Sequence, residues 1–466
     1  MTLGFSAVAL PPMQGDNHRP SVSNQQASWI ASIASISIPA GCLMIGGLLD
    51  QVGRRRSMML LNVPAILGWV LIATTSEHQH LFFYQIYAGR LLTGIATGMA
   101  STPATVYLSE VADRNLRGAL VTWTSIGISL GILIVYILGA ILQENWRVVA
   151  GLSICFPALS IICIWLLVPE SPVWLASKGY IQEAELVMKK MRGVSLENNL
   201  PEELQQELDT IAQNNNDNCR QHRSWRDLMK ILKKPESYKP LLIMNAFFFF
   251  QQWSGIFVVV FYAVSIVKET GVSFDGYIAS VLIGITRLIV SIVISYASKK
   301  YGRRILTNIS GIGMTCSICV LAAFLTFMND GILRRETAVS LNWIPISALI
   351  MYILTSSIGF LTLPWAMIGE VFPYEIRGPA CGFTTCLAYI FSFIIVKLYP
   401  EMKDVWGNHG VFIFYTIIAL IGSITMFKYL PETQGRTLEQ IQQNFSKKEM
   451  AQEEKVVTEI LLTEKT

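Results

Sequence analysis

The sequence predicts an all-α polytopic membrane protein with two bundles of six helices, of which the first helix is incomplete. Apolar runs long enough to cross a bilayer, which takes about 20 residues, recur along the whole chain. Only 15% of the residues are charged, whereas a soluble domain carries about 25%. Several short motifs of the first half recur in the second half at the same internal spacing, which indicates a duplicated unit.

Twelve apolar segments follow one another along the chain, and we expect each to form a membrane helix. Residues 1–12 reach only half the length of a span. We expect them to be the outer half of a helix whose missing part is encoded upstream, because half a helix leaves backbone groups facing lipid. The eleven full-length segments are residues 28–49, 57–75, 81–109, 119–142, 146–168, 239–267, 276–297, 305–328, 341–369, 379–399 and 410–430.

The Lys and Arg residues of the connections predict the orientation, because basic connections lie on the cytosolic side of a membrane. Connections 76–80 and 143–145 carry neither residue, so we place them outside. Arg334 and Arg335 are an exception, because they are basic residues in a connection that we also place outside. The basic residues cluster at the ends of apolar runs, which indicates topology and no nucleic-acid partner. The basic connections are 50–56, 110–118, 177–238 and 298–304.

One long insertion, residues 177–238, separates the two halves. Leu204, Leu208 and Ile211 stand at helical spacing within it, which favours short cytosolic helices; a solvated charged linker is the alternative. The predicted domains are 1–176 (first bundle, helix 1 incomplete), 177–238 (cytosolic linker helices), 239–434 (second bundle) and 435–466 (cytosolic tail).

Three motifs recur near the predicted cytosolic ends of helices in the two halves. Transporters use such duplications to build two bundles with a binding site between them. One isolated Gly-Arg-Arg would mean little, but three paired motifs in register are specific. The pairs are Gly53-Arg54-Arg55 with Gly302-Arg303-Arg304, Glu110 and Arg117 with Glu370 and Arg377, and Pro169-Glu170-Ser171 with Pro431-Glu432-Thr433.

Two adjacent amides, Gln251 and Gln252, lie near the middle of the run 239–267. A polar side chain without a partner is costly at this depth. Such a Gln can hydrogen-bond to a neighbouring helix, which is the simplest interpretation. The following Ser254 and Gly255 soften the helix, and this combination favours a polar ligand site.

The sequence offers no nucleophile–base pair and no cluster of metal ligands at a workable spacing. We therefore expect no enzyme, no metal and no cofactor.

Seven motifs together resemble the sugar porter family of the major facilitator superfamily. Within that family, residues 384–402 are most similar to insect facilitated trehalose transporters. The resemblance covers nearly the whole chain. The motifs are GGLLDQVGRRR at 46–56, GRLLTG at 89–94, PATVYLSEVADRNLRG at 103–118, PESPVWL at 169–175, QQWSG at 251–255, PWAMIGEVFPYEIRG at 364–378 and PETQGRTLEQI at 431–441.

The resemblance implies a major facilitator fold and sugar contacts on several helices. The sequence keeps the family's glutamine pair and its tryptophan, Trp365, whose ring offers an apolar surface to a sugar ring. At other family positions the usual amide or tryptophan is replaced, and an unpaired buried hydroxyl costs about 1–3 kcal/mol, so the identity of the substrate stays open. The predicted substrate contacts are Gln251, Gln252, Trp365, Ser125, Phe257, Arg287 and Tyr389.

Arg287 is the most informative replacement, because it stands where the family carries an Asn. A cation in the middle of a membrane helix is expensive and normally faces a cavity or a partner. We expect Arg287 to border the central cavity and to bind substrate oxygens or a backbone carbonyl. The alternative is that its stem snorkels to water.

The repeated charges match family positions that latch the two halves together on the cytosolic side. Partly exposed ion pairs of about 0–1 kcal/mol each suit a closure that must break; a topology signal alone is the alternative. Lys299 and Val173 depart from the family pattern, which predicts a weaker latch. The predicted gate residues are Asp50, Arg54, Arg55, Glu110, Arg117, Glu170, Arg303, Arg304, Glu370, Arg377 and Glu432.

The mode of transport follows from the first helix, where family symporters carry an Asp after a Gly-aromatic pair. Here Gly4-Phe5 is followed by Ser6, and Arg90 cannot carry a proton by itself. We therefore predict a monomeric, facilitative sugar uniporter of the plasma membrane, with trehalose or a related small sugar as substrate. The alternatives are a proton-coupled symporter and a non-transporting nutrient receptor on a carrier scaffold.

Overall fold

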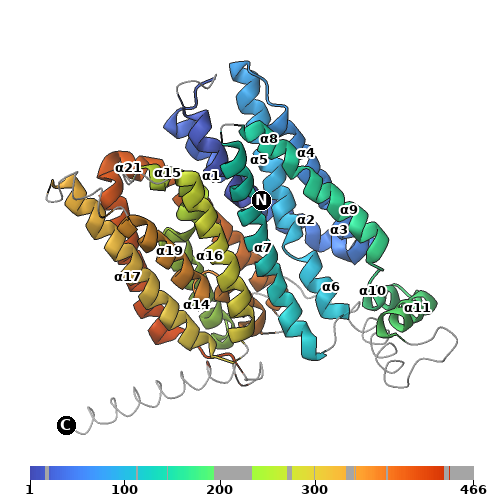
Figure 1. Ribbon diagram of the computed structural model, residues 1–466. Helices are drawn as coiled ribbons and strands as arrows, with labels where there is room; N and C mark the ends of the chain where they lie inside the picture. Colours follow the sequence, from blue (N-terminus) through green and yellow to red (C-terminus); the bar gives the residue numbers. More distant parts are fainter. Residues whose placement is uncertain are drawn as a thin grey trace, which may run out of the picture. The chain divides into compact units, whose positions relative to one another are not determined.

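The computed structural model is all-helical, as the sequence predicts (Figure 1). Within the residues described, nine helices are long and apolar enough to cross a membrane. The prediction of an all-α polytopic fold is confirmed. The structure describes residues 1–15, 20–111, 114–143, 145–193, 233–269, 275–298, 300–331, 341, 343–373, 376–434, 440 and 445.

The chain divides into two compact units, which we describe separately. Unit 1 comprises Met1–His222, Phe257–Leu288 and Ser392–Val405, and unit 2 comprises Arg223–Ile256, Ile289–Phe391 and Trp406–Thr466. The domain boundaries at 176, 238 and 434, drawn from the duplicated motifs, stay a prediction.

Unit 1 holds the helices of the first half of the chain. Residues 1–12 form α1, and three predicted runs each consist of two successive helices: α3 with α4, α5 with α6, and α8 with α9. The helices are α1 (Thr2–Met13), α2 (Asn24–Val52), α3 (Arg54–Leu60), α4 (Asn62–Ala73), α5 (Gln79–Ala100), α6 (Pro103–Val111), α7 (Arg114–Leu142), α8 (Trp146–Ser153), α9 (Cys155–Leu167), α10 (Pro172–Ser177) and α11 (Ile181–Arg192).

Small residues let the helices of unit 1 approach closely. α5 packs against α2 and α4, and α7 packs against α1 (Figure 1). A Cβ added to Gly41 of α2 would lie 2.1 Å from the carbonyl oxygen of Ile95, and one added to Gly98 of α5 would lie 2.1 Å from that of Ile38. Any larger residue at either position would push the two helices apart, as at other membrane helix interfaces.

The second half of the chain supplies the remaining helices. α15 and the beginning of α16 belong to unit 1, and the others lie in unit 2 apart from residues 392–405. α21 covers two predicted runs and contains one non-helical residue, Gly407, at φ 67°. The helices are α14 (Pro235–Trp253), α15 (Ile256–Glu269), α16 (Gly276–Ala297), α17 (Arg303–Asn329), α19 (Trp343–Ile358), α20 (Leu363–Val371) and α21 (Arg377–Tyr429).

Two of these predicted runs are interrupted. The run 239–267 breaks between α14 and α15 at Ser254 and Gly255, and the run 341–369 breaks between α19 and α20 at residues 359–362. Pro364 stands in the first turn of α20, where its missing N–H costs nothing.

Of the insertion, α11 is helical. The predicted amphipathic segments at Leu204, Leu208 and Ile211, and most of the predicted tail 435–466, lie outside the described residues.

Candidate functional site

Gln251 and Gln252 end α14 and are both fully buried. The Gln251 amide nitrogen donates to the carbonyl oxygens of Phe360 and Leu361, at 2.6 and 3.0 Å. The Gln252 amide nitrogen donates to Oε1 of Gln251 at 3.3 Å. The Gln251 side chain therefore binds the interrupted α19–α20 segment, and the Gln252 side chain binds that of Gln251.

The orientation of both amides follows from these partners. Two carbonyl oxygens can be satisfied only by a donor, so the Gln251 nitrogen must face Phe360 and Leu361. Its oxygen then faces Gln252, which must present its own nitrogen. Oε1 of Gln252 is left as a buried acceptor with no hydrogen-bond partner among the described residues. Leaving such an atom unsatisfied costs about 1–3 kcal/mol, so it is a ready acceptor for a hydroxyl.

Aromatic rings gather in the same unit. The Trp365 ring lies 4.8 Å from that of Phe248 and 5.4 Å from that of Tyr389, measured between centroids. Trp365 and Tyr389 are both half-buried. The structure thus brings together two of the predicted substrate contacts. Their rings are tilted by 41° to each other, and aromatic rings offer an apolar surface to the face of a sugar.

The other three predicted contacts lie in unit 1. Phe257 on α15 is 5% exposed, and Ser125 on α7 is half-buried. Arg287 on α16 is also 5% exposed. Its burial favours a position inside the helix packing over the snorkelling alternative.

Tyr136 of α7 packs against α16 near Arg287. A Cβ added to Gly284, one turn before Arg287, would lie 3.2 Å from the Tyr136 ring. The Tyr136 hydroxyl donates to the carbonyl oxygen of Val260 on α15 at 2.7 Å, and Tyr136 and Arg287 are close enough to interact electrostatically. The cation therefore lies where α7, α15 and α16 meet.

A second buried cation, Arg90 of α5, ties α1 and α2 together. Its guanidinium donates to the carbonyl oxygens of Thr2 at 2.8 Å and Ile30 at 3.0 Å, and to that of Ala31 at 3.3 Å. It also donates to the hydroxyl of Ser6 at 2.8 Å. These four acceptors are all neutral groups.

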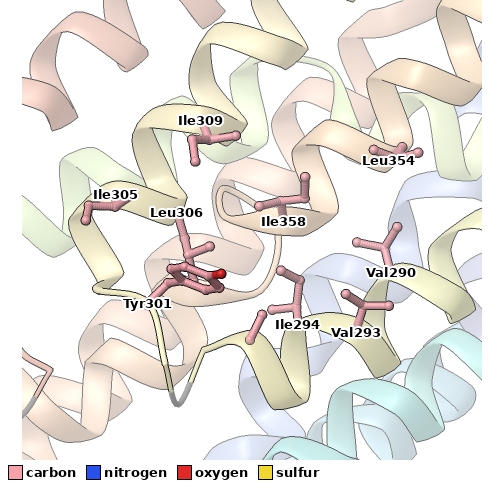
Figure 2. A pocket seen from close by; sticks show the side chains of 10 residues that line it. Val290, Val293, Ile294, Tyr301, Ile305, Leu306, Ile309, Leu354 and Ile358 are labelled. Carbon is pink, nitrogen blue, oxygen red and sulfur yellow. The ribbon is translucent and has the colours of Figure 1, made fainter.

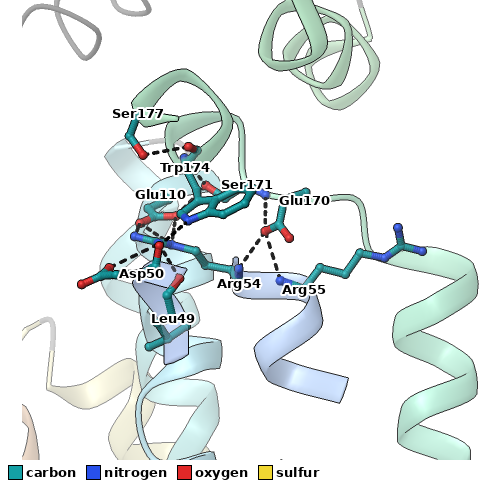
Figure 3. A network of polar contacts seen from close by, with 9 residues as sticks. All are labelled: Leu49, Asp50, Arg54, Arg55, Glu110, Glu170, Ser171, Trp174 and Ser177. Atoms are coloured by element: carbon teal, nitrogen blue, oxygen red, sulfur yellow. Dashed lines mark hydrogen bonds and ion pairs between the residues drawn. The ribbon is translucent and has the colours of Figure 1, made fainter. Parts of the chain in front are cut away.

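Four predicted gate residues of the first half, Asp50, Arg54, Glu110 and Glu170, lie together in a polar cluster (Figure 3). Arg54 pairs with Glu110 through its Nη2 at 2.7 Å, and both side chains are 13% exposed. Oε1 of Glu170 accepts from the backbone nitrogens of Arg54 and Arg55 at 2.8 and 3.1 Å. The carboxylate thus caps the first turn of α3, where backbone N–H groups lack helical partners.

The second half repeats this arrangement with the corresponding residues. Arg303 pairs with Glu370 at 3.0 Å. Glu432 accepts from the backbone nitrogens of Arg303 and Arg304 at 2.8 and 3.1 Å, at the start of α17. The hydroxyl of Thr433 donates to Glu370, as that of Ser171 does to Glu110.

Three of the predicted gate residues show fewer ion pairs or hydrogen bonds within the described part of the chain. Asp50 has an 81% exposed side chain and lies 3.6 Å from Arg54. Nε of Arg377 is buried and has no hydrogen-bond partner among the described residues, and the side chain of Arg117 lies outside them. The structure therefore shows ion pairs within each half, and the latch stays a prediction.

A groove of about 350 Å³ lies among α16, α17 and α19 of unit 2 (Figure 2). Nine of its ten lining residues are aliphatic, and Tyr301 carries the one polar side-chain group. Because a sugar needs many hydrogen bonds, this groove does not suit a polyhydroxyl solute. Its lining residues are Val290, Val293, Ile294, Ala297, Tyr301, Ile305, Leu306, Ile309, Leu354 and Ile358.

Several of these hydrogen-bond partners were not predicted from the sequence. The repeated Ser171 and Thr433 follow the repeated glutamates directly, so their duplication was a usable signal. No sequence signal predicted the carbonyls of Phe360 and Leu361 as acceptors, because every residue has a backbone carbonyl whatever its side chain.

Comparisons with known proteins match most of the chain. The family model for sugar (and other) transporters matches residues 4–445. The facilitated trehalose transporter of Polypedilum vanderplanki is 30% identical over 95% of this chain and 85% of its own length. That of Drosophila pseudoobscura is 32% identical over 90% of this chain, but the match spans only 46% of its own length, about half of the relative.

Solved structures agree on the fold. The inward-open structure of the xylose transporter XylE from E. coli superimposes with a TM-score of 0.76 at 20% identity, covering 94% of this chain and 95% of that one. The structure of the major facilitator superfamily proton:xylose symporter XylE bound to 6-bromo-6-deoxy-D-glucose gives 0.72 at 22% identity, over 95% and 96% of the two chains. The major facilitator fold is therefore confirmed. With the family model matching nearly its full length, the chain belongs to the sugar (and other) transporter family, a family of membrane transporters and not of enzymes.

Proposed function

We propose that this protein carries trehalose or a related small sugar across the plasma membrane, down its gradient, by alternating access. Its membership of the transporter family supports transport, and its similarity to facilitated trehalose transporters supports trehalose. The unsatisfied Oε1 of Gln252 and the rings of Trp365 and Tyr389 suit a solute with hydroxyls and an apolar face.

The observation that carries the passive mode is the contact between Arg90 and Ser6. A proton-coupled carrier needs a group on the transport path that gains and loses a proton. Serine does not titrate in the physiological range, and an arginine stays charged. The fold neighbour described as a proton:xylose symporter keeps symport as the second candidate.

Gln251, Ser125, Phe257 and Arg287 stay proposed substrate contacts on the strength of the family resemblance. The two clusters around Glu110 and Glu370 are proposed as parts of a cytosolic gate. Their partly exposed ion pairs are weak enough to break in each transport cycle.

The test is uptake by the full chain in proteoliposomes, with radiolabelled trehalose, glucose and a panel of mono- and disaccharides. A passive carrier equilibrates one of these sugars and does not accumulate it when the outside is made acidic. Accumulation above equilibrium under a proton gradient would establish symport. Binding without uptake would establish a receptor.

A charge-reversing variant tests the proposed cytosolic gate. Arg117→Glu reverses a charge of the duplicated motif and is expected to cut uptake at unchanged expression. Normal uptake by this variant would count against the latch.

A further inference from the structure

The connection between α16 and α17 departs from its counterpart in the first half of the chain. Both connections end in the duplicated Gly-Arg-Arg, and in both the glycine lies against a glutamate that caps the next helix. The three residues before that motif are Asp50-Gln51-Val52 in the first half and Lys299-Lys300-Tyr301 in the second. The ion pair of Arg303 does not require this change, because Arg54 makes the corresponding pair in the first half. The change from one acid to two lysines and a tyrosine therefore points to a second role of this connection.

The apolar groove of unit 2 opens beside these residues. Its floor is formed by the buried side chains of Val290, Ile294 and Leu306. Its rim is exposed, and Val293 and Ile305 are each 55% exposed. In a membrane protein such an exposed apolar rim faces lipid, so the lipid itself is the molecule available to fill the groove.

The groove runs from the predicted cytosolic end of two membrane spans into their apolar part. α16 ends at Ala297 and α17 begins at Arg303. Val290 stands seven residues before Ala297, which corresponds to about 10 Å along the helix. The volume of about 350 Å³ lies at the lower end of the range of ligand pockets, about 300–1,000 Å³. These dimensions suit one acyl chain that lies lengthwise along α16.

Tyr301 supplies the one polar side-chain group of the lining. Figure 2 shows its hydroxyl directed toward Ile294 and Ile358, into the groove. This hydroxyl makes no hydrogen bond to any residue that the structure describes, although a tyrosine hydroxyl in apolar surroundings normally has a partner. Tyrosines are enriched at the level of the lipid headgroups, where the ester carbonyls of a glycerophospholipid are acceptors.

Lys300 places a cation at the mouth of the groove. Its ammonium lies 5.9 Å from the centroid of the Tyr301 ring. The side chain is exposed and forms no ion pair with a carboxylate of the described ranges, and Lys299 precedes it in the sequence. Anionic lipids of the cytoplasmic leaflet attract basic residues at this position.

The chemistry of the mouth decides which lipid is preferred. Lipid tails are as apolar as the groove, so transfer of a chain from the bilayer gives little preference for one lipid over another. We propose that the groove holds one acyl chain of an anionic glycerophospholipid, with an ester carbonyl accepting from Tyr301 and the headgroup phosphate bound by Lys300. This site involves no sugar and is independent of the proposed transport function.

The test is photolabelling of the full chain in phosphatidylcholine vesicles that contain phosphatidylserine with a diazirine in one acyl chain. Mass spectrometry of peptides is expected to locate the label in residues 290–309 and 354–358. Unlabelled phosphatidylserine should compete about fivefold better than phosphatidylcholine with the same chains. Soluble glycerophosphoserine, which has the headgroup and no chain, should not compete.

Three variants separate the parts of the site. Lys300→Gln, which introduces the residue of the first half, should weaken competition by phosphatidylserine about fivefold and leave that by phosphatidylcholine unchanged. Tyr301→Phe should weaken both about fivefold, because both lipids carry the ester carbonyl. Ile309→Trp, which fills the groove from its rim, should abolish labelling of the groove.

Each variant has a matched control outside the groove lining. Lys178→Gln removes another exposed lysine that lies over an aromatic ring. Tyr296→Phe removes the hydroxyl of an exposed tyrosine on α16, and Ile417→Trp enlarges an isoleucine of α21 that is 51% exposed. All three controls should label and compete like the unaltered protein.

The outcomes decide the proposal directly. Label spread evenly over the exposed helix faces, or equal competition by the two lipids in the unaltered protein, overturns it. Equal losses in a variant and its control also overturn it. Labelling of the same residues by a photoreactive sterol that phosphatidylserine does not displace would assign the groove to a sterol instead.

Discussion

Gly255→Ala tests the geometry of the break between α14 and α15 most directly. Gly255 has φ +89°, a conformation that costs a residue with a Cβ about 1–2 kcal/mol. The added Cβ would lie 2.6 Å from Cδ2 of Tyr415 and 2.9 Å from two further ring atoms. Moving a packed ring in this way costs about 1–3 kcal/mol.

One effect opposes these two. Alanine restricts the unfolded chain more than glycine does, which stabilises the fold by about 0.4–1 kcal/mol. The sum predicts that Gly255→Ala lowers the free energy of unfolding by about 3 kcal/mol. The assay is equilibrium unfolding of the purified protein in mixed micelles, followed by far-ultraviolet circular dichroism.

Two further variants separate the contribution of the Gly255 backbone conformation from that of the contact with Tyr415. Gly382→Ala, inside α21 with no atom within 4 Å of the added Cβ, is the matched control and is expected to stabilise slightly, because alanine is the better helix former. In a Tyr415→Leu background the steric part disappears, so the cost of Gly255→Ala should fall to about 1 kcal/mol. Equal effects of Gly255→Ala and Gly382→Ala, or an undiminished cost in the Tyr415→Leu background, would refute the reasoning.

Three other predictions concern the charged groups. Glu110→Gln should lower the free energy of unfolding by about 1–3 kcal/mol and Glu370→Gln by less, because the Glu370 side chain is 35% exposed against 13% for Glu110; equal losses in chemical unfolding would contradict this order. Uptake by the unaltered protein should stay flat between about pH 5 and 8, whereas Ser6→Asp should make it pH-dependent by placing a titratable carboxyl beside Arg90; a flat profile for the variant would remove this contact from the transport path. Arg287→Asn, which restores the family residue, should change the range of sugars taken up in the competition panel, and an unchanged range would exclude Arg287 from the solute site.

The helices were predictable because a bilayer leaves few alternatives. Every predicted run is mainly helical within the described residues, two of them with an interruption, since backbone groups in lipid must be satisfied internally. The Arg54 and Arg303 clusters were also predictable as sets, because duplication doubled the signal. Their internal pairing was harder to predict: Glu110 and Glu170 look equivalent in the sequence, yet one binds a guanidinium and the other caps α3.

The helix breaks show where sequence reasoning stops. Ser254 and Gly255 signalled the first break. In the second run the interruption at residues 359–362 precedes Pro364, although proline is the residue that breaks helices most strongly. The cause is tertiary: Gly359 lies against the backbone of α17, and Gln251 supplies the donors that the freed carbonyls need. Neither contact follows from the local pattern, because the partners are 50 residues or more apart in the chain.

The two carboxylate caps show how a duplicated motif can keep its chemistry while its backbone changes. Glu170 and Glu432 each accept hydrogen bonds from the two backbone nitrogens of an arginine pair earlier in the chain. Gly53 reaches this geometry at φ +100°, whereas Gly302 reaches it at φ −61°. Both nonetheless leave no room for a side chain, since an added Cβ would meet the carboxylate at 2.5 Å in the first half and in even closer contact in the second. What requires glycine in both halves is therefore the approach of the carboxylate, and the left-handed backbone is a further requirement of the first half alone.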